Sequence, residues 1–226
     1  QDALTLGSGA TDRTFTLTSG TLALGSFTLT THIFNSSNAN TRTINFGTGN
    51  ITVKSASAAT VVVLTTTTGL TISGTPLIQI TGGGATTKTI DTAALAEASS
   101  ISYTLSATAG TVAFTASNTV RDLTISNTAF TLSNIAITIY GNLTIAGTTP
   151  TLTAGTNAWT FASTSSKTIT SNGKAIDWPV TFNGVAGTWT LQDSFTTGSG
   201  RTTTLTNGTL ALGTFTYTTG LFSSTG

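Results

Sequence analysis

The sequence of 226 residues contains no cysteine and no methionine, and only 7% of its residues are charged. The absence of cysteine excludes disulfide bonds and zinc sites built on thiolates. Eight Lys and Arg residues are nearly balanced by seven Asp and Glu residues, which gives a formal net charge of +1. So few cations cannot form the basic surface that nucleic acid requires, and we expect no nucleic-acid partner. Because no apolar run approaches about 20 residues, we also expect no membrane insertion.

Threonine is abundant and makes up roughly a quarter of the chain. It is β-branched and prefers extended backbone, whereas glutamate, a good helix former, occurs once, at Glu97. Polar and apolar residues alternate in Thr14–Thr18, Thr43–Phe46, Thr168–Thr170 and Trp189–Leu191. This period of two places one set of side chains inward and the other outward. Since 38% of the residues are hydrophobic and recur in order, the pattern predicts an all-β fold and not a disordered segment.

Glycine and asparagine separate the expected strands. The run Gly82-Gly83-Gly84 and the pair Asn172-Gly173 supply residues that adopt the positive φ angles of tight corners. The only candidate helix is Thr92–Ser99, which is either one or two helical turns or a loop that caps the fold.

One long internal repeat is present. Arg13–Thr31 (RTFTLTSGTLALGSFTLTT) is matched by Arg201–Thr219 (RTTTLTNGTLALGTFTYTT). Upstream, Gln1–Gly9 matches Gln192–Gly200, and residues 10–12 form a loop insertion in the first copy. The unit is therefore about 190 residues long.

This repeat defines the expected domain organisation. Residues 1–190 form one long-period β unit, and residues 191–226 begin its next copy. Because the chain passes from one unit into the next, we expect it to be a piece of a longer array.

A shorter repeat predicts the architecture. The hexapeptides that begin at Leu70 (LTISGT), Leu123 (LTISNT) and Leu143 (LTIAGT) are alike, and the last two lie 20 residues apart. A spacing of about 20 residues suits one coil of a β-solenoid, which would give roughly 11 coils. Tandem β-sandwich modules are the alternative, because the apolar run Val61–Leu64 suits a strand buried on both faces.

Chemistry-bearing residues are few. His32 is the only histidine, and its counterpart in the second copy is Gly220, so we expect a surface or loop role. Asp2 and Asp193 occupy equivalent repeat positions and are expected to accept backbone N–H bonds at a corner. The carboxylates are Asp2, Asp12, Asp91, Glu97, Asp122, Asp177 and Asp193. Asp122 is expected to end a strand, and Asp177 has no second acid nearby in sequence to form a glycosidase pair. We predict no enzymatic activity, no catalytic residue, no metal site and no cofactor.

Two further patterns have a functional alternative. Trp159, Trp178 and Trp189 could form a platform for sugars, although core packing is the favoured interpretation. Thr-x-Thr pairs such as Thr28-x-Thr30 and Thr168-x-Thr170 are typical of ice-binding faces, but their irregular spacing favours a plain uncharged β surface.

Several phrases in the chain resemble the Thr/Gly/Asn-rich β-repeat regions of large phage tail-fibre-like structural proteins. They are GTLALGSFTL, RTINFGTGNITV, VRDLTISNTAF, YGNLTIAGTTPTLTAG, KTITSNGKAIDWPVTFNG and GTWTLQDSF. They are also similar to passenger regions of bacterial autotransporter or haemagglutinin-type adhesins. The resemblance implies an extended extracellular or virion-surface rod that serves host attachment. Its expected partners are other copies or neighbouring units of the same protein, with cell-surface glycans as a further possibility. A bacterial adhesin or filament subunit, an ice-binding β-solenoid and a polysaccharide-degrading β-helix enzyme are the alternatives.

Overall fold

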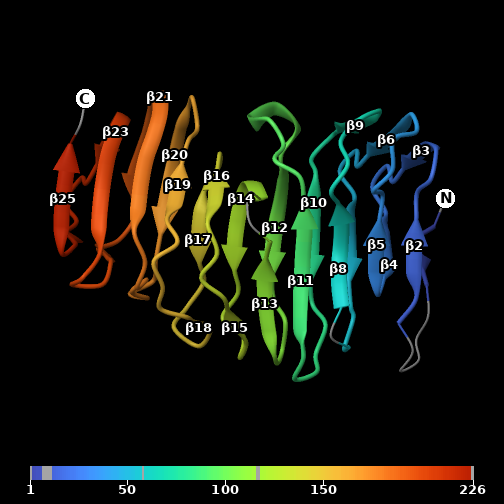
Figure 1. The fold of residues 1–226 in the computed structure, drawn as a ribbon, viewed down its shortest axis with the longest axis horizontal. Coiled ribbons are helices and arrows are strands. Elements are labelled where there is room, and N and C mark those ends of the chain that lie inside the picture. Colours follow the sequence, from blue (N-terminus) through green and yellow to red (C-terminus); the bar gives the residue numbers. More distant parts are fainter. Residues whose placement is uncertain (1, 7–11, 58, 116–117, 225–226) are drawn as a thin grey trace.

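The computed structural model is a β-solenoid of about ten coils, which stack along one axis from the N-terminal to the C-terminal end (Figure 1). The structure describes residues 2–6, 12–57, 59–115 and 118–224. Strand pairs among these residues are parallel. The prediction of an all-β solenoid is confirmed. The sandwich alternative is wrong, because sandwich sheets pair their strands in antiparallel fashion.

Each coil places its strands on three sides, here named side I, side II and side III. Side I holds β1 (Leu4–Thr5), β4 (Thr28–Thr31), β7 (Asn50–Val53), β10 (Leu77–Ile80), β12 (Ile101–Leu105), β17 (Leu143–Ile145) and β20 (Ser166–Thr170). Side II holds β2 (Thr14–Thr16), β5 (Ile33–Asn35), β8 (Ala59–Leu64), β11 (Thr87–Thr92), β13 (Thr111–Phe114), β15 (Thr131–Leu132), β18 (Thr151–Leu152), β22 (Phe195–Thr196) and β24 (Tyr217–Thr218). Side III holds β3 (Gly20–Ala23), β6 (Arg42–Asn45), β9 (Leu70–Ser73), β16 (Ile137–Ile139), β19 (Trp159–Phe161) and β25 (Leu221–Ser224).

Long strands join two sides in the C-terminal half. β14 (Asn118–Ile125), β21 (Val180–Leu191) and β23 (Thr202–Ala211) each run from side III around a corner onto side I. In the fourth coil the third strand is replaced by a short 3-10 helix, η1 (Glu97–Ser99). The candidate helix at Thr92–Ser99 is therefore reduced to three residues, because Thr92 still belongs to β11.

The core is a set of columns of like side chains, one side chain from each coil. On side I the strand register aligns Leu4, Leu29, Ile51, Ile78, Tyr103, Leu123, Leu143, Ile169 and Leu191. From Leu29 to Leu191 these side chains are at most 2% exposed. Alternation along each strand produces this burial, because every second residue points into the solenoid.

Coil length varies although the register does not. Successive residues of the side I column are 20 to 27 positions apart, so the expectation of about 20 residues per coil holds only for part of the chain. Leu123 and Leu143 are paired neighbours, as their hexapeptides predicted. Leu70 begins β9 on side III instead, which explains why its spacing from Leu123 is not a multiple of one coil. Loops at the corners absorb the differences in length.

The second copy of the 190-residue repeat is shifted by one side of the coil relative to the first copy. Leu29 lies in β4 on side I, whereas its counterpart Tyr217 lies in β24 on side II. The local backbone is nevertheless the same in both copies: Gly20 and Gly208 have φ angles of 79° and 91°. One unit therefore advances by eight coils plus one side. The boundary at residue 190 stays a prediction, and residues 10 and 11 of the loop insertion lie outside the described residues.

The glycine run at residues 82–84 forms a corner whose glycines are not equivalent. Gly84 has a φ of +85°, and a Cβ atom there would lie 2.1 Å from the carbonyl oxygen of Ala56 in the preceding coil. Gly83 has neither constraint, because a Cβ atom would meet only the Thr108 hydroxyl at 3.1 Å.

We predict that Gly84→Ala lowers the free energy of unfolding by about 2 kcal/mol or more, because left-handed backbone and a clash with a carbonyl are both unfavourable. Gly83→Ala is the matched control and should change stability by less than about 1 kcal/mol. Urea unfolding followed by circular dichroism measures both variants. Equal stabilities for the two would show that the corner does not require glycine at residue 84.

Candidate functional surfaces

The carboxylates serve mainly as acceptors that join neighbouring coils. Asp91 accepts a hydrogen bond of 2.8 Å from the Thr115 hydroxyl. Asp122 accepts one of 3.0 Å from the Ser102 hydroxyl and one of 2.8 Å from the backbone N–H of Asn142. These partners lie in adjacent coils, so each carboxylate links the coil before or after its own. Asp122 also lies inside β14 and does not end a strand, which corrects the expectation for this residue.

Asp193 behaves as the repeat predicted. It accepts backbone N–H bonds from Ser171, at 2.9 Å, and from Asn172, both in the preceding coil. Asp2 occupies the equivalent position in the first copy and is exposed. The N–H donors to Asp193 come from the preceding coil, whereas Asp2 lies in the first coil that the structure describes.

The hydrogen-bond donors to Glu97 lie farther away in the sequence than those of the other acids. Its carboxylate accepts hydrogen bonds from the Ser163 hydroxyl at 2.8 Å and the Thr164 hydroxyl at 2.9 Å. Burial raises the pKa of Glu97, but these hydrogen bonds and the charge of Lys167 outweigh burial and lower the pKa overall. The partners lie 66 and 67 residues away, so this acid ties the fourth coil to the seventh across two short coils.

The remaining candidates for acid–base chemistry are also engaged in contacts. Asp177 forms an ion pair of 2.7 Å with Arg201. His32 accepts a hydrogen bond of 3.1 Å from the backbone N–H of Arg13 through Nδ1, which lies 3.3 Å from Asp12. His32 lies in the bend between β4 and β5, which confirms the loop role, but it is only 8% exposed and is therefore not a surface residue. In the part of the chain that the structure describes, no group of three or more His, Asp or Glu residues could hold a metal ion.

The tryptophans lie in the core. Trp159, Trp178 and Trp189 are at most 1% exposed, which confirms the packing interpretation and excludes an exposed sugar platform built from them. The rings of Trp159 and Trp178 pack at an interplanar angle of 37°, with their centroids 4.8 Å apart. Phe182 and Trp189 lie 5.6 Å apart. These rings fill the interior of the C-terminal coils.

Two buried cations were not singled out from the sequence. Arg42 is 1% exposed and Lys88 is 0% exposed. Both donate to carbonyl oxygens at corners: Arg42 to Ser36, Asn40, Thr66 and Thr68, and Lys88 to Gly84, Thr86 and Ala109. Burial lowers the pKa of both cations. The alternation in Arg42-Thr-Ile44 and Lys88-Thr-Ile90 was the available signal, because it places each cation on the same face as a core isoleucine.

Lys88 should give the protein a specific pH dependence. Because burial lowers its pKa in the folded state, the unfolded chain binds more protons between that lowered pKa and 10.5, the ordinary value. We therefore predict that the unfolding free energy of the wild type rises relative to that of Lys88→Met as the pH increases toward 10.5. Burial also raises the pKa of Tyr217 to about 12, which reduces stability above pH 10, but both proteins share this effect. Urea titrations at pH 7 and pH 10 measure the difference, and a constant difference would contradict the prediction.

Threonine ladders cover the outer surface. On side III the register aligns Thr119, Thr138, Thr160, Thr181, Thr204 and Ser223 in six successive coils. Thr119 is buried and its hydroxyl accepts a hydrogen bond from the backbone N–H of Leu95, so the partly exposed row begins at Thr138. On side I the register aligns Thr5, Thr30, Thr52, Gln79, Thr104, Thr124, Thr144 and Thr170. The irregular sequence spacing of Thr-x-Thr was therefore a poor guide, because corner loops vary while the strands stay in register. On side I the outward positions beside this ladder include Leu77 and Asp122, so the threonines form one row without a second row next to it.

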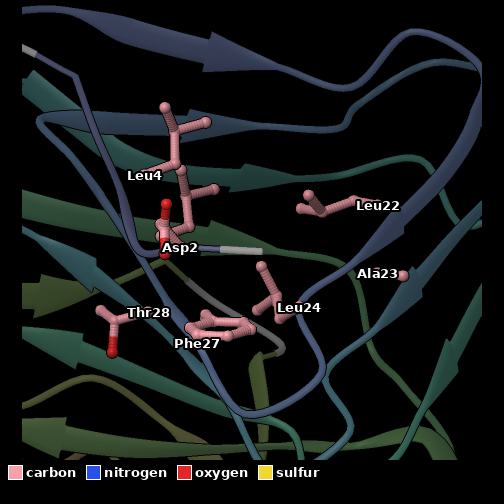
Figure 2. A pocket seen from close by; sticks show the side chains of 8 residues that line it. Asp2, Leu4, Leu22, Ala23, Leu24, Phe27 and Thr28 are labelled. Atoms are coloured by element: carbon pink, nitrogen blue, oxygen red, sulfur yellow. The ribbon is translucent and has the colours of Figure 1, made fainter.

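Both ends of the solenoid expose apolar side chains. Figure 2 shows the hollow at the first coil, where Leu4, Leu22, Leu24 and Phe27 lie around an opening next to Asp2. Leu4 is 49% exposed. At the other end, Leu221 is 61% exposed. Strand edges that lack a neighbouring strand offer unpaired N–H and C=O groups to another chain.

Comparisons with family models, curated proteins and solved structures give no significant match to the chain. The helices of the described residues include none with the length and hydrophobicity to cross a membrane.

Proposed function

We propose that the chain is a non-enzymatic structural segment, a rod or spacer within a repetitive fibre outside a cell or on a virion surface. The observation that carries this proposal is the continuous parallel stack of coils, whose first and last coils expose apolar side chains and have outer strand edges without a partner among the described residues. Each coil is held by the next through backbone hydrogen bonds and aligned side chains, which makes a stiff unit whose length is set by the number of coils. Ten coils at about 4.8 Å each span roughly 48 Å.

The phage tail-fibre-like role, with host attachment as its wider purpose, is the form of this proposal that the sequence resemblance favours. A bacterial adhesin or filament subunit shares the same mechanics. The engagement of the carboxylates in bonds between coils supports a non-enzymatic role over a polysaccharide-degrading enzyme, which needs two acids facing a substrate.

Electron microscopy of the protein at its native length tests the rod. We expect continuous unbranched rods in which the solenoid runs without gaps. Compact separate particles would overturn the proposal. Flanking sequence then separates the two origins, because a virion assembly domain would indicate a phage fibre and a secretion domain a bacterial adhesin.

Ice binding is a second candidate because the threonine ladder of side III presents four partly exposed threonines in successive coils, from Thr138 to Thr204. A regular file of hydroxyl and methyl groups can order water on a flat face. Thermal hysteresis and ice-crystal shape measure this activity directly. If ice binding is present, Thr160→Tyr should abolish it, whereas Thr131→Tyr on side II should not. Ordinary freezing of the wild type would exclude this candidate.

A further inference from the structure

The C-terminal end face is an apolar surface made by the last coil. Leu212 is 39% exposed, Phe215 39% and Phe222 48%. Leu205, Leu210, Leu212, Tyr217, Thr219 and Phe222 line a hollow there. In the described residues β25 pairs only with β23, so its outer edge has no partner strand. A contiguous apolar surface beside an open strand edge is typical of a docking site.

The first copy of the repeat contains the same surface. The correspondence extends past Thr31, because IFNS at residues 33–36 aligns with LFSS at residues 221–224. The strand register is the same too: Phe15 pairs with Phe34, and their counterparts Thr203 and Phe222 pair with each other. The first residue of the second strand donates an equivalent backbone hydrogen bond of 3.0 Å in both copies. The N–H of Ile33 donates to the carbonyl of Arg13, and the N–H of Leu221 donates to the carbonyl of Arg201. The two surfaces are therefore built alike.

In the first copy this surface is covered by the chain itself. β6 pairs with β3, β7 pairs with β4, and β8 pairs with β5. These three strands lie within residues 42–64.

The cover accounts for a large difference in exposure between the two copies. Leu24 is 6% exposed and Phe34 is 0% exposed under these strands, against 39% for Leu212 and 48% for Phe222 at the uncovered end. The same residues thus lose most of their exposure where a segment with the sequence of β6 to β8 lies over them.

We propose that the C-terminal end face is the docking site for a further copy of residues 42–64, supplied by another unit of the same protein. Ile44 and Ile51 contribute the inward side chains that pair with Leu22 and Leu29 in the first copy. Their copies would pair with Leu210 and Tyr217. The inference deepens the proposed function, on which it rests, by naming the contact through which units join. Each added unit begins one side of the coil later than the unit before it. Because a coil has three sides, equivalent surface residues lie on the same side again after three units.

The test extends the chain in a way that the repeat dictates. Gly226 aligns with Asn38, so a copy of residues 39–64 is appended directly after Gly226. We expect the appended segment to become ordered and the amides of β24 and β25 to exchange at least ~10-fold more slowly with deuterium. The matched control carries the same extension with Asp at the copies of Ile44 and Ile51, and should leave the exchange of β25 as in the parent.

The inference is overturned if β25 exchanges equally fast in the parent, the extended chain and the control. That result alone leaves the rod intact wherever microscopy of the native protein shows continuous rods. Protection of β25 together with compact native particles would have the opposite meaning: the docking contact would stand, and the fibre proposal would fall.

Discussion

Arg42→Met should lower the free energy of unfolding by about 3 kcal/mol or more. The Arg42 guanidinium donates at 2.9 Å to the carbonyl of Ser36, at 3.0 Å to Asn40 and at 2.8 Å to Thr68, and it also contacts the carbonyl of Thr66. Methionine preserves the apolar stem but leaves these acceptors without donors at two adjacent corners. Removing one side of a buried, charge-assisted set of hydrogen bonds costs about 3–5 kcal/mol.

Urea unfolding gives the global effect of Arg42→Met, and hydrogen exchange at residues 36–41 and 66–69 locates it. Arg121→Met is the control, because its guanidinium donates to Ala98 at 2.8 Å in an exposed position. It should change stability by less than about 0.5 kcal/mol. Arg42→Lys should be intermediate, since an ammonium group cannot reproduce the planar fork of donors. Wild-type stability for Arg42→Met would show that water replaces the guanidinium without loss.

Trp178→Ala should cost about 3–5 kcal/mol, the usual effect of emptying a large buried aromatic site. Trp178 is 0% exposed, and its ring packs at a tilt against that of Trp159, with the ring centroids 4.8 Å apart. The solenoid interior cannot collapse into the space, because the strands on either side are fixed by their register to the coils above and below.

Trp178→Phe is the matched control for the alanine variant. The indole Nε1 of Trp178 has no hydrogen-bond partner among the described residues, so phenylalanine loses no bond and keeps an aromatic contact with Trp159. It should cost about half as much or less. Thermal and urea unfolding measure both variants, and equal losses would contradict the prediction, because they would mean that a phenylalanine ring recovers none of the packing lost in the alanine variant.

The architecture was readable from the sequence because its signals are local. Alternation in segments such as Thr168–Thr170 fixed the strands, and the 20-residue spacing of Leu123 and Leu143 fixed one coil. Corner glycines such as Gly173 were also readable, because positive φ favours this residue type. Short-range rules of this kind need no knowledge of what lies above or below a strand.

What the sequence concealed depends on how coils stack. The side on which a motif lies depends on every loop length before it, which is why LTISGT at Leu70 and LTISNT at Leu123 lie on different sides. The threonine ladders were missed for the same reason. Asp122 was expected to end a strand, but β14 turns a corner without interruption at this residue. Arg42 and Lys88 were overlooked because each also donates to carbonyls of the following coil, Arg42 to Thr68 and Lys88 to Ala109, which lie more than 20 residues away in the sequence.

The most direct test of a continuous, homotypically stacked rod is helical reconstruction of the native fibre by cryo-electron microscopy. One unit of eight coils plus one side should advance by about 40 Å along the axis, with a layer line near 4.8 Å from the stacked strands. Each unit should be rotated by one side relative to the last, so that the full period is about 120 Å. A longer advance with gaps between units, or units related without this rotation, would contradict the account.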